Sequence, residues 1–427
     1  MAREYKDSGI EWIGQIPKEW EVCPHKHIMF KKKEIQEHYA GQDIISLTMN
    51  GVVVRNLDAG GKMPLSFDGY QIIYPNNLLL CLFDIDVTPR CVGLINNYGV
   101  TSPAYSQFVV KEKGYPPYYD YLLRYMDDHK CLLHLSKNLR SSLTETDFGQ
   151  IKTCIPPYIE QQKIADYLDK VCGEVDEMVA LQETMIEELK AYKQSVITEA
   201  VTKGLNPNVS MRNSGIDWIG EIPEGWKLGR IKNLCSIISK GATPPTIDNE
   251  AYNGSVRFIK CENISGNKLV NNALYYISSE SNNSMKRSQL KENDILFVIA
   301  GATIGKTAIV TQDFLPSNTN QAVSFLRLQN KQYTNYLWYI LQSQVIQKPL
   351  WLNAVQSAQP NLSMEDLGNF DMPIPDESEQ RAIASYLDTK CSEIDSLIAL
   401  KQAKIEELKE YKKSVIYEYV TGKKEVV

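Results

Sequence analysis

Several arginine, lysine and amide side chains stand where they could contact a nucleic acid. Arg55 and Arg90 lie beside turn residues at expected strand edges, and Tyr105 ends the stretch TSPAY. An arginine can read guanine through a bidentate contact in the major groove, and it also binds phosphates. For each side chain taken alone, a solvated surface or turn position is the simpler interpretation. The corresponding candidates in the second half of the chain, where amides suit bidentate adenine contacts, are Arg257, Lys260, Asn318, Asn320 and Gln321.

The stretch Gly301–Thr307, GATIGKT, invites comparison with a phosphate-binding loop. That motif requires four residues between the first glycine and the Gly-Lys pair, and here there are three. Nucleotide binding is therefore disfavoured. Two alternatives remain, a tight turn that carries Lys306 toward a DNA phosphate and a plain structural turn.

The sequence contains no recognisable catalytic or metal-binding motif. Pro156-Pro157-Tyr158 resembles part of a methyltransferase box, but Cys154-Ile155 precede it where Asn or Asp would stand, so we expect a strand-to-helix joint. The histidine pairs lack the i,i+4 spacing of a helical metal site and a nearby acidic ligand. We therefore expect no catalysis, no metal and no cofactor in this chain. The pairs are His25/His27 and His129/His134.

The chain contains two internal sequence repeats. Asp7–Val22 and Asn213–Leu228 share nine of 16 residues, including two tryptophans and a proline in each copy. Ile155–Thr202 aligns without gaps to Ile374–Thr421, with 27 of 48 positions identical. A period of more than 200 residues is too long for a solenoid repeat. The chain is therefore a duplicated module that consists of a globular segment followed by a helix.

Each copy of the longer repeat predicts a helix of about 40 residues. Apolar residues follow the 4-3 spacing of a coiled-coil seam, as at Val175, Val179 and Ile186. The matched seams favour antiparallel pairing of the two helices with each other; packing on the own domain and pairing with another protein are the alternatives. Gly204 and Pro207 should end the first helix and mark a domain boundary.

The two globular segments share an order of expected strands and helices. Apolar runs such as Asn77–Phe83 and Asp294–Ala300 predict buried strands, and Thr144 and Ser363 are expected helix N-caps. We expect the two tryptophans of each short repeat to pin a hairpin to its module. The basic run Lys31–Lys33 is placed in an expected helix, Lys26–His38, as a solvated face or a phosphate contact. The loops differ, DIDVTPR at 84–90 against GATIGKT at 301–307, as two binding modules with different targets require.

Composition limits the class of protein. The chain has 427 residues with 43% hydrophobic residues, which is ordinary globular composition. It contains no run of 18 apolar residues and no apolar leader, so we expect neither a membrane span nor a signal peptide, and nine scattered cysteines suggest a reducing cytoplasm. The net charge is −6, and residues 155–206 alone hold 10 acidic and 5 basic residues. Acidic helices suit protein partners and leave the globular segments free to carry basic faces.

Together these features resemble the specificity subunit of type I restriction–modification enzymes. The resemblance covers nearly the whole chain and rests on the SGIEWIG and SGIDWIG openings, GVTSPAY, DILFVIAGATIGKTA, NTNQAVSF, AVTKGLNPN and the two helix-entry joints. It implies an α+β fold with an internal pseudo-twofold repeat. Two similar target-recognition domains would be separated by two long helices that pair as an antiparallel coiled coil. The implied domains are 1–154 and 207–373 for recognition, with conserved helical regions at 155–206 and 374–427.

The resemblance also implies a function. Each recognition domain would read one half of a bipartite duplex DNA target, and the coiled coil would set the spacing between the halves. The partners would be two modification subunits, which bind S-adenosylmethionine and methylate adenine, and restriction subunits, which bind ATP and Mg²⁺. The alternative is a non-catalytic coiled-coil adaptor that binds only proteins.

Overall fold

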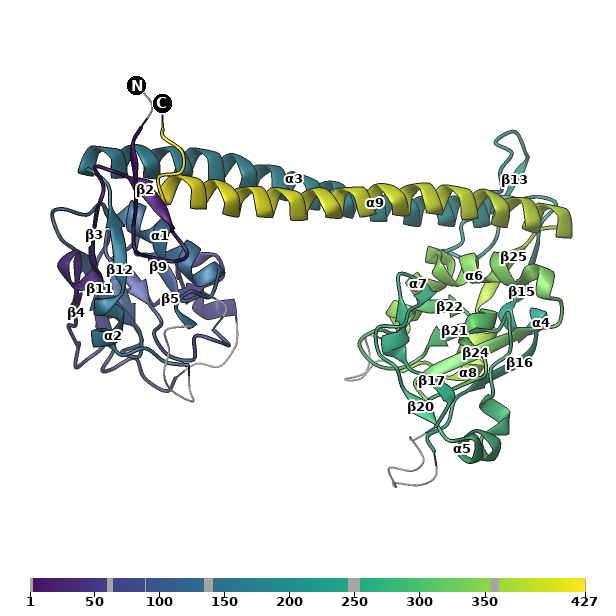
Figure 1. The fold of residues 1–427 in the computed structure, drawn as a ribbon. Helices are drawn as coiled ribbons and strands as arrows, with labels where there is room; N and C mark the ends of the chain where they lie inside the picture. The colour runs from purple at the N-terminus through teal and green to yellow at the C-terminus, as the bar shows by residue number, and fades with distance from the viewer. Residues whose placement is uncertain are drawn as a thin grey trace. The chain divides into compact units, whose positions relative to one another are not determined.

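The computed structural model describes residues 3–59, 64–88, 90–133, 141–244, 254–354 and 361–426 (Figure 1). The chain divides into two compact units. The first unit contains Met1–Glu183 and Ala403–Val427, and the second contains Thr184–Gln402. Each unit therefore combines one mixed α/β body with part of both long helices.

The first unit is built around a four-stranded antiparallel sheet with the order β4-β11-β8-β9. Its strands are β4 (Met29–Lys32), β11 (Ser106–Val110), β8 (Leu78–Leu80) and β9 (Val92–Leu94). The helix α1 (Pro116–Asp128) begins with two prolines and lies between this sheet and the long helix α3 (Figure 1). Its tyrosines bind the long helices, because the Tyr121 hydroxyl donates to Asp169 at 2.7 Å and the Tyr118 hydroxyl to the Val420 carbonyl at 2.8 Å.

Shorter strand pairs and one helix complete the first unit. They are β1 (Tyr5–Asp7) with β2 (Gln15–Pro17), β3 (Glu21–Pro24) with β12 (Lys152–Ile155), β5 (Ile45–Thr48) with β6 (Gly51–Val54), β7 (Gln71–Ile73) with β10 (Gly99–Thr101), and α2 (Glu145–Gln150).

The second unit repeats the sheet with the order β16-β24-β21-β22. Its strands are β16 (Cys235–Lys240), β24 (Val323–Leu328), β21 (Ile295–Val298) and β22 (Thr307–Ile309). The helix α6 (Thr334–Gln342) takes the place of α1, and its Tyr339 hydroxyl donates to Asp388 at 2.7 Å. The predicted α+β frame, shared by two modules with different loops, is confirmed.

The second unit also has its own additions to the sheet. They are β13 (Met211–Asn213) with β14 (Glu221–Pro223), β15 (Lys227–Arg230) with β25 (Asp371–Ile374), β18 (Ile264–Ser265) with β19 (Lys268–Leu269), and β20 (Tyr276–Ile277), β17 (Val256–Ile259) and β23 (Ser317–Thr319) in one sheet. Its remaining helices are α4 (Ile231–Leu234), α5 (Ser279–Ser284), α7 (Gln344–Ala354) and α8 (Met364–Asn369).

The long helices α3 (Tyr158–Lys203) and α9 (Glu377–Val420) run antiparallel within each unit (Figure 1). In the first unit Lys412 binds Asp176 at 2.7 Å, and in the second Lys193 binds Asp395 at 2.6 Å. The two ion pairs join the same positions of the 48-residue repeat, since Lys193 aligns with Lys412 and Asp176 with Asp395. The predicted pairing of the repeat helices with each other is confirmed in both units.

The short repeats form the predicted hairpins. The Trp20 indole is buried and donates to Glu160 at 3.0 Å, while the Trp226 indole donates to Glu379 at 2.8 Å. Each hairpin is therefore tied to the first turn of its long helix by the same contact. The predicted N-caps are also present, because the hydroxyls of Thr144 and Ser363 accept the backbone N–H three residues on.

The helix expected at Lys26–His38 is wrong. The structure has a short 3-10 turn at His25–His27, followed by the strand β4. Met29 to Lys32 pair with β11, so the sheet ladder satisfies the backbone that a helix would have satisfied internally. Tertiary pairing overrides local helix preference here.

Candidate nucleic-acid interface

Several strands of the second unit end at one edge, and most of the predicted contact residues lie there. β17 and β23 are parallel, with Ile259 opposite Thr319, so Lys260 and Asn320 leave the sheet at the same end. β16 and β21 both pair antiparallel to β24, which brings Lys240 and Val298 to the start of that strand. We call this edge of the second unit the strand-end surface.

Backbone hydrogen bonds hold the parts of the strand-end surface together. The amide of Ala242 donates to the carbonyl of Thr319 at 3.1 Å, and the amide of Ile299 donates to the carbonyl of Ala322 at 2.9 Å. The hydroxyl of Thr243 donates to Gln321, which is exposed. The side chain of Asn320 is half-buried and accepts the amide of Ala322 at 3.2 Å.

Two predicted cations, Arg257 on β17 and Lys260 just after it, lie against aromatic rings. The Lys260 ammonium lies 3.6 Å from the centre of the Tyr275 ring, and the Arg257 guanidinium lies 4.7 Å from that of Phe314. Arg257 also donates to Asn271 at 2.9 Å. Both side chains are half-buried and oriented, whereas Lys306 is exposed at the end of the hairpin loop between β21 and β22.

The predicted DNA contact is wrong for Asn318. Its side chain is fully buried on β23, with 0% exposure. The amide nitrogen donates to Asn282 at 2.9 Å and to the Met285 carbonyl at 3.2 Å, and the amide oxygen accepts the Thr319 amide. Asn318 therefore fastens α5 to the sheet and has no free group for a base.

A basic groove lies beside the strand-end surface, at the side of α5. It has a volume of about 440 Å³ and is lined by the end of β16 and by residues 283–288. Lys240, Lys286 and Arg287 are its charged lining residues, and all three are exposed. Serines 239, 284 and 288 and Asn283 add hydrogen-bonding groups. Cations with polar side chains suit the phosphates and sugars of a nucleic acid.

The first unit has a corresponding edge. Thr101 donates to the Ile45 carbonyl at 2.7 Å, as Thr319 donates to that of Ile259 at 2.8 Å, so the end of β10 lies against Ile45 as the end of β23 lies against Ile259. Tyr105 lies at this edge, half-buried, with its ring centre 6.2 Å from that of Phe83. Phe83 begins the loop that corresponds to GATIGKT.

The two arginines predicted in the first unit are more enclosed than expected. Arg90 has a side-chain exposure of 17% and lies 3.6 Å from Asp128 of α1. Burial raises the pKa of the nearby Asp120 carboxyl, and the charges of Arg124 and Arg90 oppose that rise. Arg90 therefore binds its loop to α1. Arg55 is half-buried beyond β6, and its amide donates to the Ile44 carbonyl at 2.7 Å.

The GATIGKT stretch is a hairpin loop. It joins β21 to β22, and Gly301 and Gly305 adopt φ values of 89° and 90°. Thr307 begins a strand, whereas a phosphate-binding loop leads into a helix whose N–H groups cradle the phosphate. The geometry supports the two turn interpretations and not nucleotide binding.

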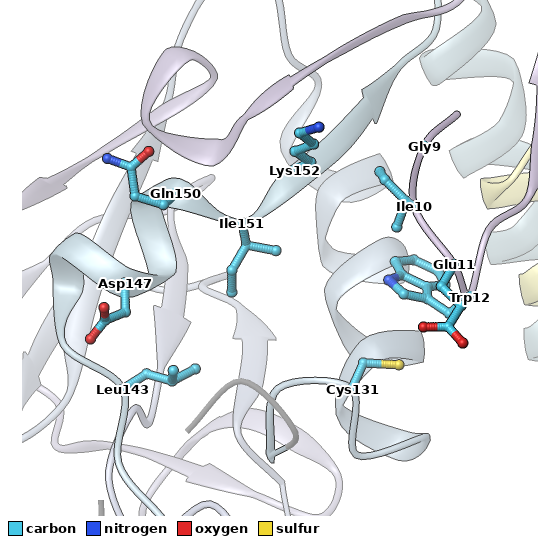
Figure 2. A pocket seen from close by; sticks show the side chains of 10 residues that line it. All are labelled: Gly9, Ile10, Glu11, Trp12, Cys131, Leu143, Asp147, Gln150, Ile151 and Lys152. Atoms are coloured by element: carbon cyan, nitrogen blue, oxygen red, sulfur yellow. The ribbon is translucent and has the colours of Figure 1, made fainter. Parts of the chain in front are cut away.

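A separate cavity of about 870 Å³ lies in the first unit (Figure 2). Ile10, Trp12 and Leu143 give it apolar walls, and Lys152 and Asp147 lie at its sides. Burial raises the pKa of the Cys131 thiol in its wall, which makes that thiol a poor nucleophile. The residues labelled in Figure 2 thus offer apolar binding surface and no evident reaction chemistry.

The described residues hold neither a candidate metal site nor a membrane-spanning helix. The described parts of the chain contain no group of three His, Cys, Asp or Glu side chains that could hold a metal ion. His134 of the second histidine pair lies outside the described residues. No helix in the described ranges is long and apolar enough to cross a membrane.

Comparison with known proteins shows which proteins the chain is similar to. Residues 223–410 match the family model described as "Type I restriction modification DNA specificity domain". The MjaVIII specificity subunit of Methanocaldococcus jannaschii is 28% identical over 280 residues, which cover 65% of this chain and 63% of that subunit. The chain is thus similar to type I restriction–modification specificity subunits. The EcoBI specificity subunit of Escherichia coli is 30% identical over 255 residues, which cover 57% of this chain and 52% of that subunit.

Solved structures share the fold of this chain. One, titled "Structural basis underlying complex assembly and conformational transition of the type I R-M system", aligns with a TM-score of 0.70 at 16% identity, over 95% of this chain and 98% of that one. The HsdS subunit from Thermoanaerobacter tengcongensis aligns with a TM-score of 0.50 at 17% identity, over the same shares of the two chains. At such identities the likeness to the solved structures concerns the fold alone. The chain spans about half to two thirds of the length of the curated relatives named above.

Sequence reasoning missed three residues of the second unit, Lys240, Lys286 and Arg287. They are scattered over 48 positions of the sequence and meet only because β16 and α5 flank one groove. The one available signal was the basic run Lys31–Lys33, because β4 and β16 occupy the same place in the two sheets.

Proposed function

We propose that this chain recognises a bipartite DNA sequence within a type I restriction–modification complex. Each globular unit reads one half-site, and the paired helices set the gap between the half-sites. The observation that carries the proposal is the repeated sheet, which keeps one strand order in both units while the loops at its strand ends differ. Two modules on one frame with different loops suit two different half-sites.

The chain supplies recognition, and its partners supply the chemistry. Modification subunits bind S-adenosylmethionine and methylate adenine, and restriction subunits bind ATP and Mg²⁺ and cleave. The long helices carry exposed apolar side chains at equivalent repeat positions, which suits two copies of one partner. These side chains are Met178, Leu181 and Tyr411 in the first unit and Leu397, Leu400 and Tyr192 in the second.

An adaptor that binds only proteins is not favoured. Such a protein would need the helices but not a groove with three cations at its globular end. A gel shift with duplex DNA, with and without a modification subunit, separates the two functions. The adaptor would shift no duplex in either case.

Single-molecule sequencing of methylated bases tests the proposal directly. We expect a host that expresses this chain with a modification subunit to carry methylated adenines in one bipartite sequence with a fixed gap. Methylation without a consensus sequence, or in a single uninterrupted sequence, would contradict the proposal.

A further inference from the structure

One lysine occupies the same place in both units although the surrounding loops differ. In the second unit Lys240 pairs with Ser324 of β24, which pairs with Phe297 of β21. In the first unit Ser106 of β11 pairs with Leu80 of β8, the equivalent of Phe297. The last β4 pair is Lys32 with Gln107, so the next residue, Lys33, comes to the position beside Ser106. Lys33 and Lys240 are therefore structurally equivalent.

Both lysines are exposed and carry charges that the unit does not neutralise. Neither makes an ion pair with any residue that the structure describes. Their neighbours in the first unit behave differently, because Lys31 binds Glu145 and Lys32 lies 3.5 Å from Glu34 and 3.5 Å from the Tyr74 ring. Of the basic run, Lys33 is thus the cation left for a ligand.

The backbone directly after Lys240 is closely packed, which fixes the position of this lysine. Gly241 follows it, and a Cβ at that glycine would lie 2.0 Å from the Thr319 carbonyl oxygen. The backbone after Lys240 is therefore pressed against β23, beside Asn320 and Gln321. On the other side lie Lys286 and Arg287, and none of the described residues that line the groove between them is acidic. This environment attracts an anion.

Apart from the paired serines Ser106 and Ser324, several residues around the two lysines differ between the units. Tyr105 stands where the second unit has Val323, Ser46 where it has Lys260, and the loops after β8 and β21 differ in sequence. A contact that reads a base must change when the half-site changes, whereas a contact with the phosphate backbone need not. A lysine that is present in both units, while its neighbours differ, therefore fits a phosphate contact better than a base contact.

We propose that Lys33 and Lys240 are equivalent phosphate-contacting residues, one for each half-site. They anchor each unit on the DNA backbone without regard to sequence, and the neighbouring divergent side chains read the bases. In the second unit Lys286 and Arg287 extend the same backbone contact along the groove. This inference rests on the proposed function, since it assigns the phosphate anchors within the same DNA interface.

The test measures how DNA affinity depends on salt, for the full chain in complex with its modification subunits. A phosphate contact by one cation contributes about 0.9 to the slope of log K against log salt. We expect Lys33→Gln and Lys240→Gln each to lower the slope by about 0.9, and the double variant by about twice that, equally for target and unrelated duplexes. Lys227→Gln is the matched control, because Lys227 is an exposed lysine on β15, beside α9 (Figure 1).

Four further results decide the matter. Lys33→Arg and Lys240→Arg should keep the wild-type slope, because they keep the positive charge. If the glutamine variants lost slope only through misfolding, the arginine variants would not be expected to differ from them. Slopes equal to those of the wild-type complex in both glutamine variants would overturn the inference, as would a changed consensus at either half-site in methylation mapping. If the wild-type complex does not prefer its target over unrelated duplex, the proposed function itself fails, so the two failures are distinguishable.

Discussion

Four residues inserted at matched points of α3 and α9 should lengthen the gap between half-sites by one base pair. The matched points are set by the two interhelix ion pairs, because Asp176 faces Lys412 and Lys193 faces Asp395. The residue numbers sum to the same value in both pairs, so the point after Lys190 in α3 lies opposite the point after Leu397 in α9. Inserting Glu-Glu-Leu-Lys at each point keeps the helices paired.

Helix and DNA geometry determine the size of the effect. Four residues add about 6 Å of helix at 1.5 Å per residue, and they rotate the part of the helix beyond the insertion by about 40° at 3.6 residues per turn. One base pair adds about 3.4 Å and about 35°. The rise alone would allow nearly two base pairs, but the rotation matches one, and rotation decides which groove each unit faces. We therefore expect a gap one base pair longer.

Methylation mapping of the insertion variant is the assay. The bases of both half-sites should stay the same, because no loop of either globular unit is altered. An insertion in α3 alone is the control, since it leaves the seam mismatched and should lower activity. An active double-insertion variant with the original gap would refute the idea that the paired helices measure the spacing.

Three other perturbations test parts of the structure. Burial lowers the pKa of His25 from about 6.5 to about 4, so the folded state binds the neutral imidazole more readily than the charged one. The resulting contribution to the free energy of unfolding is complete above pH 6.5 and is lost as the pH falls toward 4, by up to about 3 kcal/mol. If the unfolding free energy of the wild type fell no faster with acid than that of His25→Leu, the prediction would be contradicted. Ser363→Ala removes the N-cap of α8 and should cost about 1 kcal/mol in denaturant unfolding, whereas no cost would argue against the cap. The purified chain should hydrolyse no ATP, and a turnover abolished by Lys306→Ala would revive the phosphate-loop interpretation.

The helices and their joints were accessible from the sequence because local patterns determine them. The 4-3 seam, the stop at Gly204 and the caps at Thr144 and Ser363 all depend on neighbours within a few residues. Because the chain is duplicated, most of these patterns occur twice, which supports each prediction independently. Buried strands such as β8 and β21 were also predictable, since both are short runs of fully buried apolar residues.

The errors and omissions come from contacts between distant residues. Lys26–His38 has a helical composition, but pairing with β11 makes its central part a strand. Asn318 is polar, and its burial depends on α5, which lies 36 positions earlier at Asn282. Lys240 and Lys33 are equivalent only through strand pairing, because the sequences around them have diverged. Residues of this kind can be identified only when the register of the sheet is known.

Exchange of one globular segment tests the central claim most directly. Residues 1–154 would be replaced by the corresponding segment of a related specificity subunit, and the methylated sequence of the chimaera would be mapped with the modification subunit present. The account predicts that one half-site changes to that of the donor, while the other half-site and the gap stay the same. A chimaera that methylates DNA with both half-sites changed, or with neither changed, would contradict the claim that each unit reads its own half of the target.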